Sequence, residues 1–219
     1  MIADNHGLTG GLFADLNVVS QRASQIYDQA IRDYHLYDST EAEMPHVYSQ
    51  SQIEFLIYKK AWTDTVQWHV EDLIRDIDIE PAHALRLKRK IDTLNQDRTD
   101  IVEMIDMVIV NQFEDIVPLP DARINTESPA WALDRLSILC LKLYHMRQET
   151  VRKDARPEHT ERCFRKLAIL EEQHTTLSVS INELFHDISH GSKRMKVYKQ
   201  MKMYNDLSLN PVMYRKLTH

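Results

Sequence analysis

Residues 81–109 read PAHALRLKRKIDTLNQDRTDIVEMIDMVI, and residues 157–185 read PEHTERCFRKLAILEEQHTTLSVSINELF. Aligned without gaps at an offset of 76 residues, the two stretches are identical at 8 of 29 positions. Both have apolar residues at helical spacing and begin with a proline, which suits the first turn of a helix. Similarity at a fixed spacing indicates a repeated structural unit. We therefore predict a duplicated helical hairpin.

The rest of the chain agrees with helices. Only 4 glycines occur, and none lies between Leu12 and His190. Because sheets with tight turns and phosphate-binding loops need glycine, this absence argues against both. The predicted fold class is all-α: a duplicated helical hairpin forming an antiparallel four-helix core, plus an N-terminal helix and a basic C-terminal extension.

The domain prediction has three parts. Residues 1–15 are expected to be a flexible tail, residues 16–190 a single helical domain with hairpins at about 51–113 and 129–190, and residues 191–219 a basic extension packed on the domain. The extension holds seven Lys or Arg against one acid, so its charge is near +6 and that of the remainder near −12. The extension either folds back on the acidic body or meets an anionic partner.

The location of the protein is expected to be the cytoplasm. Cys140 and Cys163 form neither a CxxC pair nor a disulfide framework, which suits a reducing compartment. The start has no basic-then-apolar signal peptide. The longest apolar stretch, 136–146, is too short for a membrane span.

A polar residue interrupts the apolar seam of each long helix, at Arg98 in the first hairpin and at His174 in the second. An unpaired charge in a packed seam is costly, so Arg98 should face a carboxylate or a ligand. Asp64 and Asp134 are the candidate carboxylates. A buried ion pair that fixes helix register, an anion or metal pocket, and an open groove all remain as interpretations.

A polar site is also indicated by His69 and Asp72, which lie one turn apart, and by His145, which stands 76 residues after His69. A core histidine satisfied by a carboxylate is the simpler interpretation of the same residues. We predict one ligand-binding site and assign it no metal and no cofactor. Its residues are His69, Asp72, Asn95, Arg98, Asp134 and His145.

Two known metal patterns fit poorly. Glu171-x-x-His174 has the spacing of di-iron bundles, but the first hairpin has Arg98 at the matching position, and arginine does not bind metal. Glu103-x-x-Asp106 resembles one motif of all-α nucleotide pyrophosphohydrolases, but the neighbouring acids point in different directions around the helix.

Two functions remain. The first is a non-catalytic cytoplasmic binding or interaction module that takes a small anion or an acidic protein partner near Arg98. The alternative is a metal-dependent hydrolase that uses His69, Asp72 and carboxylates of the third helix. Nucleic acid is disfavoured because the acidic body would repel it, although the extension interleaves basic residues with tyrosine. Whether the protein is an enzyme or a homodimer stays open.

Four segments, residues 62–72, 95–100, 124–131 and 195–206, resemble an uncharacterised bacterial, Bacteroidetes-type family whose function is unknown. The resemblance covers most of residues 20–210. It implies no activity, so no catalytic role transfers to this chain. The chain departs from the family pattern at His174, where arginine is usual, and at Leu207, where proline is usual.

Overall fold

A computed structural model describes residues 11–201, 206 and 208–215. Most of the predicted tail 1–15 and the departure at Leu207 lie outside these residues. The described chain is all-α apart from one two-residue strand pair. Its elements are a 3-10 turn (Leu16–Val18), α1 (Val19–Tyr37), α2 (Ile53–Leu73), α3 (Pro81–Gln112), β1 (Arg123–Ile124), α4 (Pro129–Thr150), α5 (Pro157–Ser189), β2 (Lys193–Arg194) and α6 (Pro211–Tyr214).

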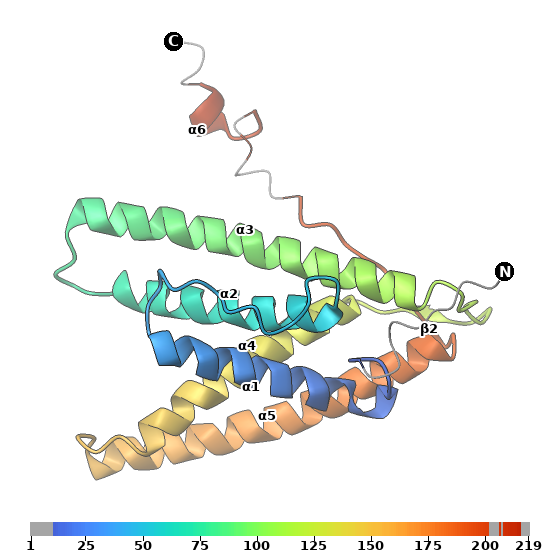
Figure 1. Cartoon of the computed structure of the whole chain (residues 1–219), viewed down its shortest axis with the longest axis horizontal. Helices are drawn as coiled ribbons and strands as arrows, with labels where there is room; N and C mark the ends of the chain where they lie inside the picture. The colour runs from blue at the N-terminus through green and yellow to red at the C-terminus, as the bar shows by residue number, and fades with distance from the viewer. Residues whose placement is uncertain (1–10, 202–205, 207, 216–219) are drawn as a thin grey trace.

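The two hairpins are α2–α3 and α4–α5, and they lie against each other, with α1 packed along α2, α4 and α5 (Figure 1). Helices α2 and α4 begin 76 residues apart, and so do α3 and α5. Pro81 and Pro157, which begin the two repeated stretches, occupy the first turns of α3 and α5. Pro129 occupies the first turn of α4 in the same way. These bounds agree with the offset found in the sequence, while the duplication itself stays a prediction.

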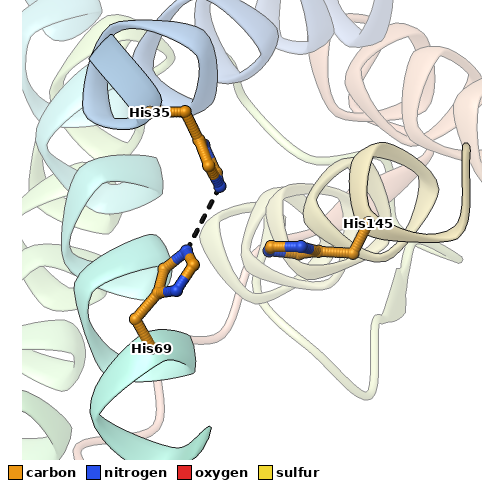
Figure 2. A group of neighbouring side chains, drawn as sticks. All are labelled: His35, His69 and His145. Atoms are coloured by element: carbon orange, nitrogen blue, oxygen red, sulfur yellow. Dashed lines mark hydrogen bonds between the residues drawn. The ribbon is translucent and has the colours of Figure 1, made fainter. Parts of the chain in front are cut away.

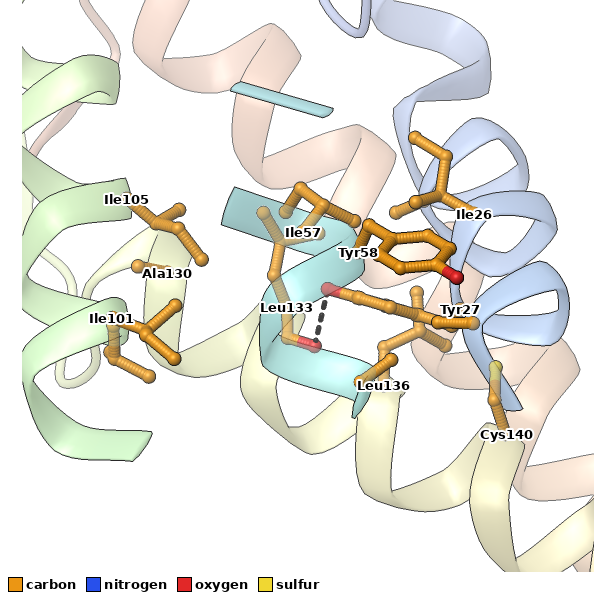
Figure 3. Close-up of a cluster of buried hydrophobic side chains, with 14 of the residues drawn as sticks. Ile26, Tyr27, Ile57, Tyr58, Ile101, Ile105, Ala130, Leu133, Leu136 and Cys140 are labelled. Carbon is orange, nitrogen blue, oxygen red and sulfur yellow. Dashed lines mark hydrogen bonds between the residues drawn. The ribbon is translucent and has the colours of Figure 1, made fainter. Parts of the chain in front are cut away.

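Helix α1 is a full member of the core. Its side chains pack against α2, α4 and α5, and Tyr27 and Tyr34 are both buried. The Tyr27 hydroxyl donates a hydrogen bond of 3.1 Å to the Leu133 carbonyl oxygen, deep among apolar side chains (Figure 3). The core therefore has five helices, because the apolar stripe of α1 is buried by both hairpins.

The apolar seam predicted along α3 consists of Leu87, Ile91, Leu94, Arg98, Ile101, Ile105 and Val108. It is buried at Leu87, Ile91, Ile101 and Ile105. Its last member, Val108, is exposed because a straight helix drifts away from a seven-residue repeat. Ile109, the next residue, is buried in its place.

Strands β1 and β2 pair in parallel and join the linker between the hairpins to the residues that follow α5. The Arg194 side chain adds a hydrogen bond of 3.0 Å from Nε to the Ala122 carbonyl oxygen. Further along, the Gln200 backbone N–H donates to Glu103 on α3. Helix α6 contacts none of the other elements and stands apart from the bundle (Figure 1). Within the described residues, no helix is both long and apolar enough to cross a bilayer.

Candidate functional site

Arg98 lies beside two carboxylates, the two that the sequence offered as its partners. Its guanidinium donates to both oxygens of Asp134, at 3.0 Å from Nε and 2.6 Å from Nη2. Asp64 Oδ1 is 3.5 Å from Nε. Two parallel bonds between a guanidinium and a carboxylate are a strong, well-oriented pairing. Arg98 is therefore engaged by the protein itself.

A buried lysine completes this group. Lys60 has a side-chain exposure of 0%, and its ammonium contacts Asp64 and lies 2.9 Å from Asp134. The Ser137 hydroxyl donates to Asp64 at 2.6 Å. We call Lys60, Asp64, Arg98 and Asp134 the ion network. Its two cations and two anions balance, which is what permits charges at this depth.

The two carboxyls of the ion network differ in acidity. Burial raises the pKa of Asp64, and the attraction of Lys60 offsets this only in part. Burial acts in the same sense on Asp134, but Lys60 and Arg98 together outweigh it and lower the pKa of that carboxyl. The difference follows from geometry, because Lys60 and Arg98 both lie within 3.0 Å of Asp134, whereas Arg98 comes no closer than 3.5 Å to Asp64.

An open cavity of about 300 Å³ lies beside the ion network. Three carboxylates and two guanidinium groups line it, so its walls carry no excess of positive charge. A small anion there would have to compete with Asp134 for Arg98. The lining residues are Asp64, Gln67, Trp68, Glu71, Asp72, Arg75, Arg98, Ile138 and Leu141.

A second polar group is formed by three histidines on three helices. His35 on the last turn of α1, His69 on α2 and His145 on α4 turn their rings toward one space (Figure 2). One ring nitrogen from each lies within 4.8 Å of the others. We call these residues the three-histidine cluster. The sequence marked His69 and His145 by their offset of 76, and the fold brings both to this place.

The orientation of His35 fixes its tautomer. Its Nδ1 lies 2.7 Å from the Ile31 carbonyl oxygen, which only accepts hydrogen bonds. Nδ1 must therefore carry the proton in the neutral ring, and Nε2 presents a lone pair. That lone pair faces His69 Nε2 at 3.2 Å (Figure 2).

Aromatic side chains hold the other two rings. His69 stacks on Tyr34 with ring centroids 5.0 Å apart, and His145 stacks on Trp68 at 4.7 Å. His145 Nε2 is buried and has no hydrogen-bond partner among the described residues. A buried nitrogen without a partner is costly unless a ligand or water meets it.

His69 and His145 favour the neutral form that binds metal. Burial, with the neighbouring His35 and His69, lowers the pKa of His145 to about 4. Burial and His35 also lower the pKa of His69. Neutral imidazole is the common ligand of Zn²⁺ and related ions. At neutral pH His69 and His145 therefore offer lone pairs rather than positive charge.

A second open cavity, of about 530 Å³, adjoins the cluster at His69. Asp38 and Asp72 line it, so carboxylates stand near the imidazoles. The Asp72 side chain is largely exposed and lies 3.6 Å from Arg75. It is thus a wall residue of the cavity, not the direct partner of His69.

The single site predicted from the sequence is thus two groups in space. His69 and His145 belong to the three-histidine cluster, and Arg98 and Asp134 to the ion network. Asp72 lines the cavities beside both groups. Asn95 accepts a hydrogen bond of 3.0 Å from Gln67, which lines the cavity of the ion network.

Two members of these groups were missed by sequence reasoning. His35 lies outside the repeat and has no spacing motif, so nothing linked it to His69. Lys60 is adjacent to Lys59 in a helix, where a lysine ordinarily faces solvent. The signal for Lys60 was indirect: a seam containing Arg98 and two candidate acids leaves one negative charge unbalanced.

No curated protein and no solved structure matches the chain. A family model described as "Protein of unknown function (DUF4254)" matches residues 54–197. The match spans α2 to α5 and includes His69 and His145, while α1 with His35 precedes it. Because the matched span is more than half of the 219 residues, the chain belongs to the DUF4254 family of proteins of unknown function.

Proposed function

We propose that this protein binds a transition-metal ion, with Zn²⁺ the best fit, through His35, His69 and His145, and that it is a metal-dependent hydrolase. The observation that carries the proposal is the convergence of three ring nitrogens from α1, α2 and α4. Two nitrogens bound to one tetrahedral zinc are about 3.4 Å apart, since each Zn–N bond is about 2.0–2.1 Å. The separation of 3.2 Å between His35 and His69 is close to that value.

The number of ligands favours catalysis over a purely structural role. Structural zinc sites generally have four protein ligands, whereas catalytic sites keep three and leave the fourth position open. A metal ion with an open position activates water and polarises a substrate oxygen. Asp38 and Asp72 line the cavity beside His69 and would be the carboxylates that accept a proton there.

A binding role at Arg98, for a small anion or an acidic protein partner, has less support. Asp134 already occupies the guanidinium, and the adjoining cavity has more acidic than basic groups. The ion network is better explained as a device that fixes how α2, α3 and α4 pack. We also propose a cytoplasmic location, because both cysteines are free thiols.

Zinc affinity tests the metal site. We expect the chelator-treated protein to bind Zn²⁺ at this cluster, and His69→Ala or His145→Ala to weaken that binding at least about 100-fold through loss of a direct ligand. Competition with a chromogenic chelator measures the affinity. His83→Ala, an exposed histidine on α3, is the control and should bind as the wild type does. Unchanged affinity in both cluster variants would rule the site out.

Hydrolysis of p-nitrophenyl acetate tests the open position. We expect the zinc-loaded protein to hydrolyse this ester faster than the metal-free protein. The rate should rise with pH through about 7, because zinc-bound water loses its proton in that range. His69→Ala should remove both the zinc dependence and the pH dependence. Equal rates with and without zinc would leave a metal-binding protein and reject the hydrolase.

A further inference from the structure

A second group of candidate metal ligands lies beside the turn that joins α4 to α5 in the second hairpin. Glu149 is on the last turn of α4, and His159 and Cys163 are one turn apart on α5. One ligand atom from each lies within 4.8 Å of the others. The group shares no residue with the three-histidine cluster, so a metal ion bound here would be independent of the proposed function.

The contacts within this group converge on one atom. His159 Nε2 lies 2.8 Å from Glu149 Oε2 and 3.3 Å from Cys163 Sγ. In a catalytic Cys–His–acid relay, the thiol and the acid bind opposite nitrogens of the imidazole. Here both face the same nitrogen. The arrangement is therefore not that of a nucleophilic triad.

His159 Nε2 cannot donate a hydrogen bond to the carboxylate and accept one from the thiol at the same time. If Nε2 carries a proton, it donates to Glu149 and cannot accept a hydrogen bond from the Cys163 thiol. If Nε2 carries a lone pair, it accepts from the thiol and faces the lone pairs of the carboxylate. A cation among the three atoms would accept an electron pair from each of them. The positions of these three atoms are thus better explained by a bound cation than by hydrogen bonds among the three side chains.

Distance and charge also suit a divalent ion. In a tetrahedral zinc site the O–N and S–N separations are about 3.4 and 3.6 Å. The present 2.8 and 3.3 Å would have to open by about half an ångström. A thiolate and a carboxylate together neutralise a 2+ charge. Arg152 also contacts Glu149 Oε2, at 2.9 Å, and would move to the other carboxylate oxygen.

We propose that Glu149, His159 and Cys163 form a second metal site, selective for thiophilic transition-metal ions, which fastens the start of α5 to the end of α4. Cys163 is buried, whereas Glu149 and His159 are partly exposed, so the ion has a path from solvent. The bound ion would close the turn 151–156 and stabilise the second hairpin.

The corresponding position in the first hairpin lacks two of the three candidate metal ligands. At the offset of 76 residues, Glu149 and Cys163 correspond to Leu73 and Leu87, and only His83 is retained for His159. Leu87 and Cys163 are both buried in the seam of their helices. Cys163→Leu therefore introduces a residue that this packing position already accepts.

Titration of the metal-free, full-length protein with Co²⁺ alone tests the proposal. A thiolate bound to Co²⁺ gives a charge-transfer band in the near ultraviolet that imidazole ligands do not give. We expect this band in the wild type and in His69→Ala, and its loss in Cys163→Leu and Cys163→Ala. Glu149→Gln, which keeps the thiol and a surface side chain of the same size, should weaken Co²⁺ binding at least about 10-fold.

The chain contains its own control, since it has only two cysteines. Burial raises the pKa of the Cys140 thiol to about 12, so Cys140 stays protonated and Cys140→Ala should keep the band. Absence of the band in the wild type at saturating Co²⁺ would overturn the proposal. A band that persists in both Cys163 variants, or unchanged binding in Glu149→Gln, would also overturn it.

Discussion

Lys60→Met is expected to destabilise the protein by about 3–4 kcal/mol at pH 7.5. The lysine ammonium is fully buried between Asp64 and Asp134, and methionine has a similar shape without the charge. Loss of the Lys60 ammonium leaves the ion network with two carboxylates and one cation in the interior. Removal of one partner from a buried charge group typically costs about 3–5 kcal/mol. Urea unfolding followed by circular dichroism measures the effect.

The pH dependence of this variant has a definite sign. Burial already raises the pKa of Asp64, and without Lys60 that pKa should rise further. A carboxyl whose folded pKa exceeds its unfolded pKa destabilises the protein above the folded pKa, and the penalty disappears as the pH falls. The difference in the free energy of unfolding between Lys60→Met and the wild type should therefore become smaller from pH 7.5 to pH 5.

Two further variants separate charge from packing. Lys88→Met removes an exposed lysine that pairs with Asp92 one turn along α3, and it should cost less than about 0.5 kcal/mol. Lys60→Met combined with Asp64→Asn restores the charge balance and should recover part of the lost stability. If Lys60→Met alone stayed within about 1 kcal/mol of wild type, the ion network would not be a structural element.

Gly191→Ala is expected to lower the free energy of unfolding by about 3 kcal/mol. Gly191 follows α5 with φ +70°, a conformation that residues with a Cβ rarely adopt. A Cβ placed there would lie 2.7 Å from the Val117 carbonyl oxygen, which is backbone and cannot swing away. The strain of the conformation and the clash with fixed atoms add to each other. Thermal and urea unfolding report the loss.

The turn at Gly191 also closes α5. The Gly191 N–H donates to Ile188 at 3.0 Å and the Ser192 N–H to Asp187 at 2.9 Å, the pattern of a Schellman cap. The Gly191 carbonyl oxygen accepts from Leu119 of the linker. His190→Ala, at an exposed neighbouring position, is the control and should change stability by less than about 0.5 kcal/mol. An unchanged unfolding midpoint in Gly191→Ala would contradict this role of Gly191.

Much of the fold could be predicted because its signals are local. Pro81, Pro129 and Pro157 mark helix starts, and the missing glycines exclude most alternatives. The strand pair could not be foreseen, since two residues in each strand leave no periodicity to detect. The depth of α1 in the core was also missed. Its apolar stripe shows that one face is buried but not how many helices bury it.

The candidate sites were predictable only where the repeat linked distant residues. His69 and His145 were paired by their offset, and the seam position of Arg98 gave Asp64 and Asp134 as candidate partners. His35, Lys60 and the group at Glu149 depend on how the helices are rotated against each other. That rotation is set by the packing of the whole core, and no spacing within one helix records it.

The pairing of β1 with β2 has a consequence for chain connectivity. Residues 125–192 leave the rest of the molecule at β1 and rejoin it at β2, and the two strands are hydrogen-bonded neighbours. Paired strands lie about 4.8 Å apart, so the whole of α4–α5 is an excursion whose ends almost meet. A segment with adjacent ends can be inserted into a chain, or exchanged for another, without displacing the backbone on either side. Such an insertion would be a direct route from one helical hairpin to two.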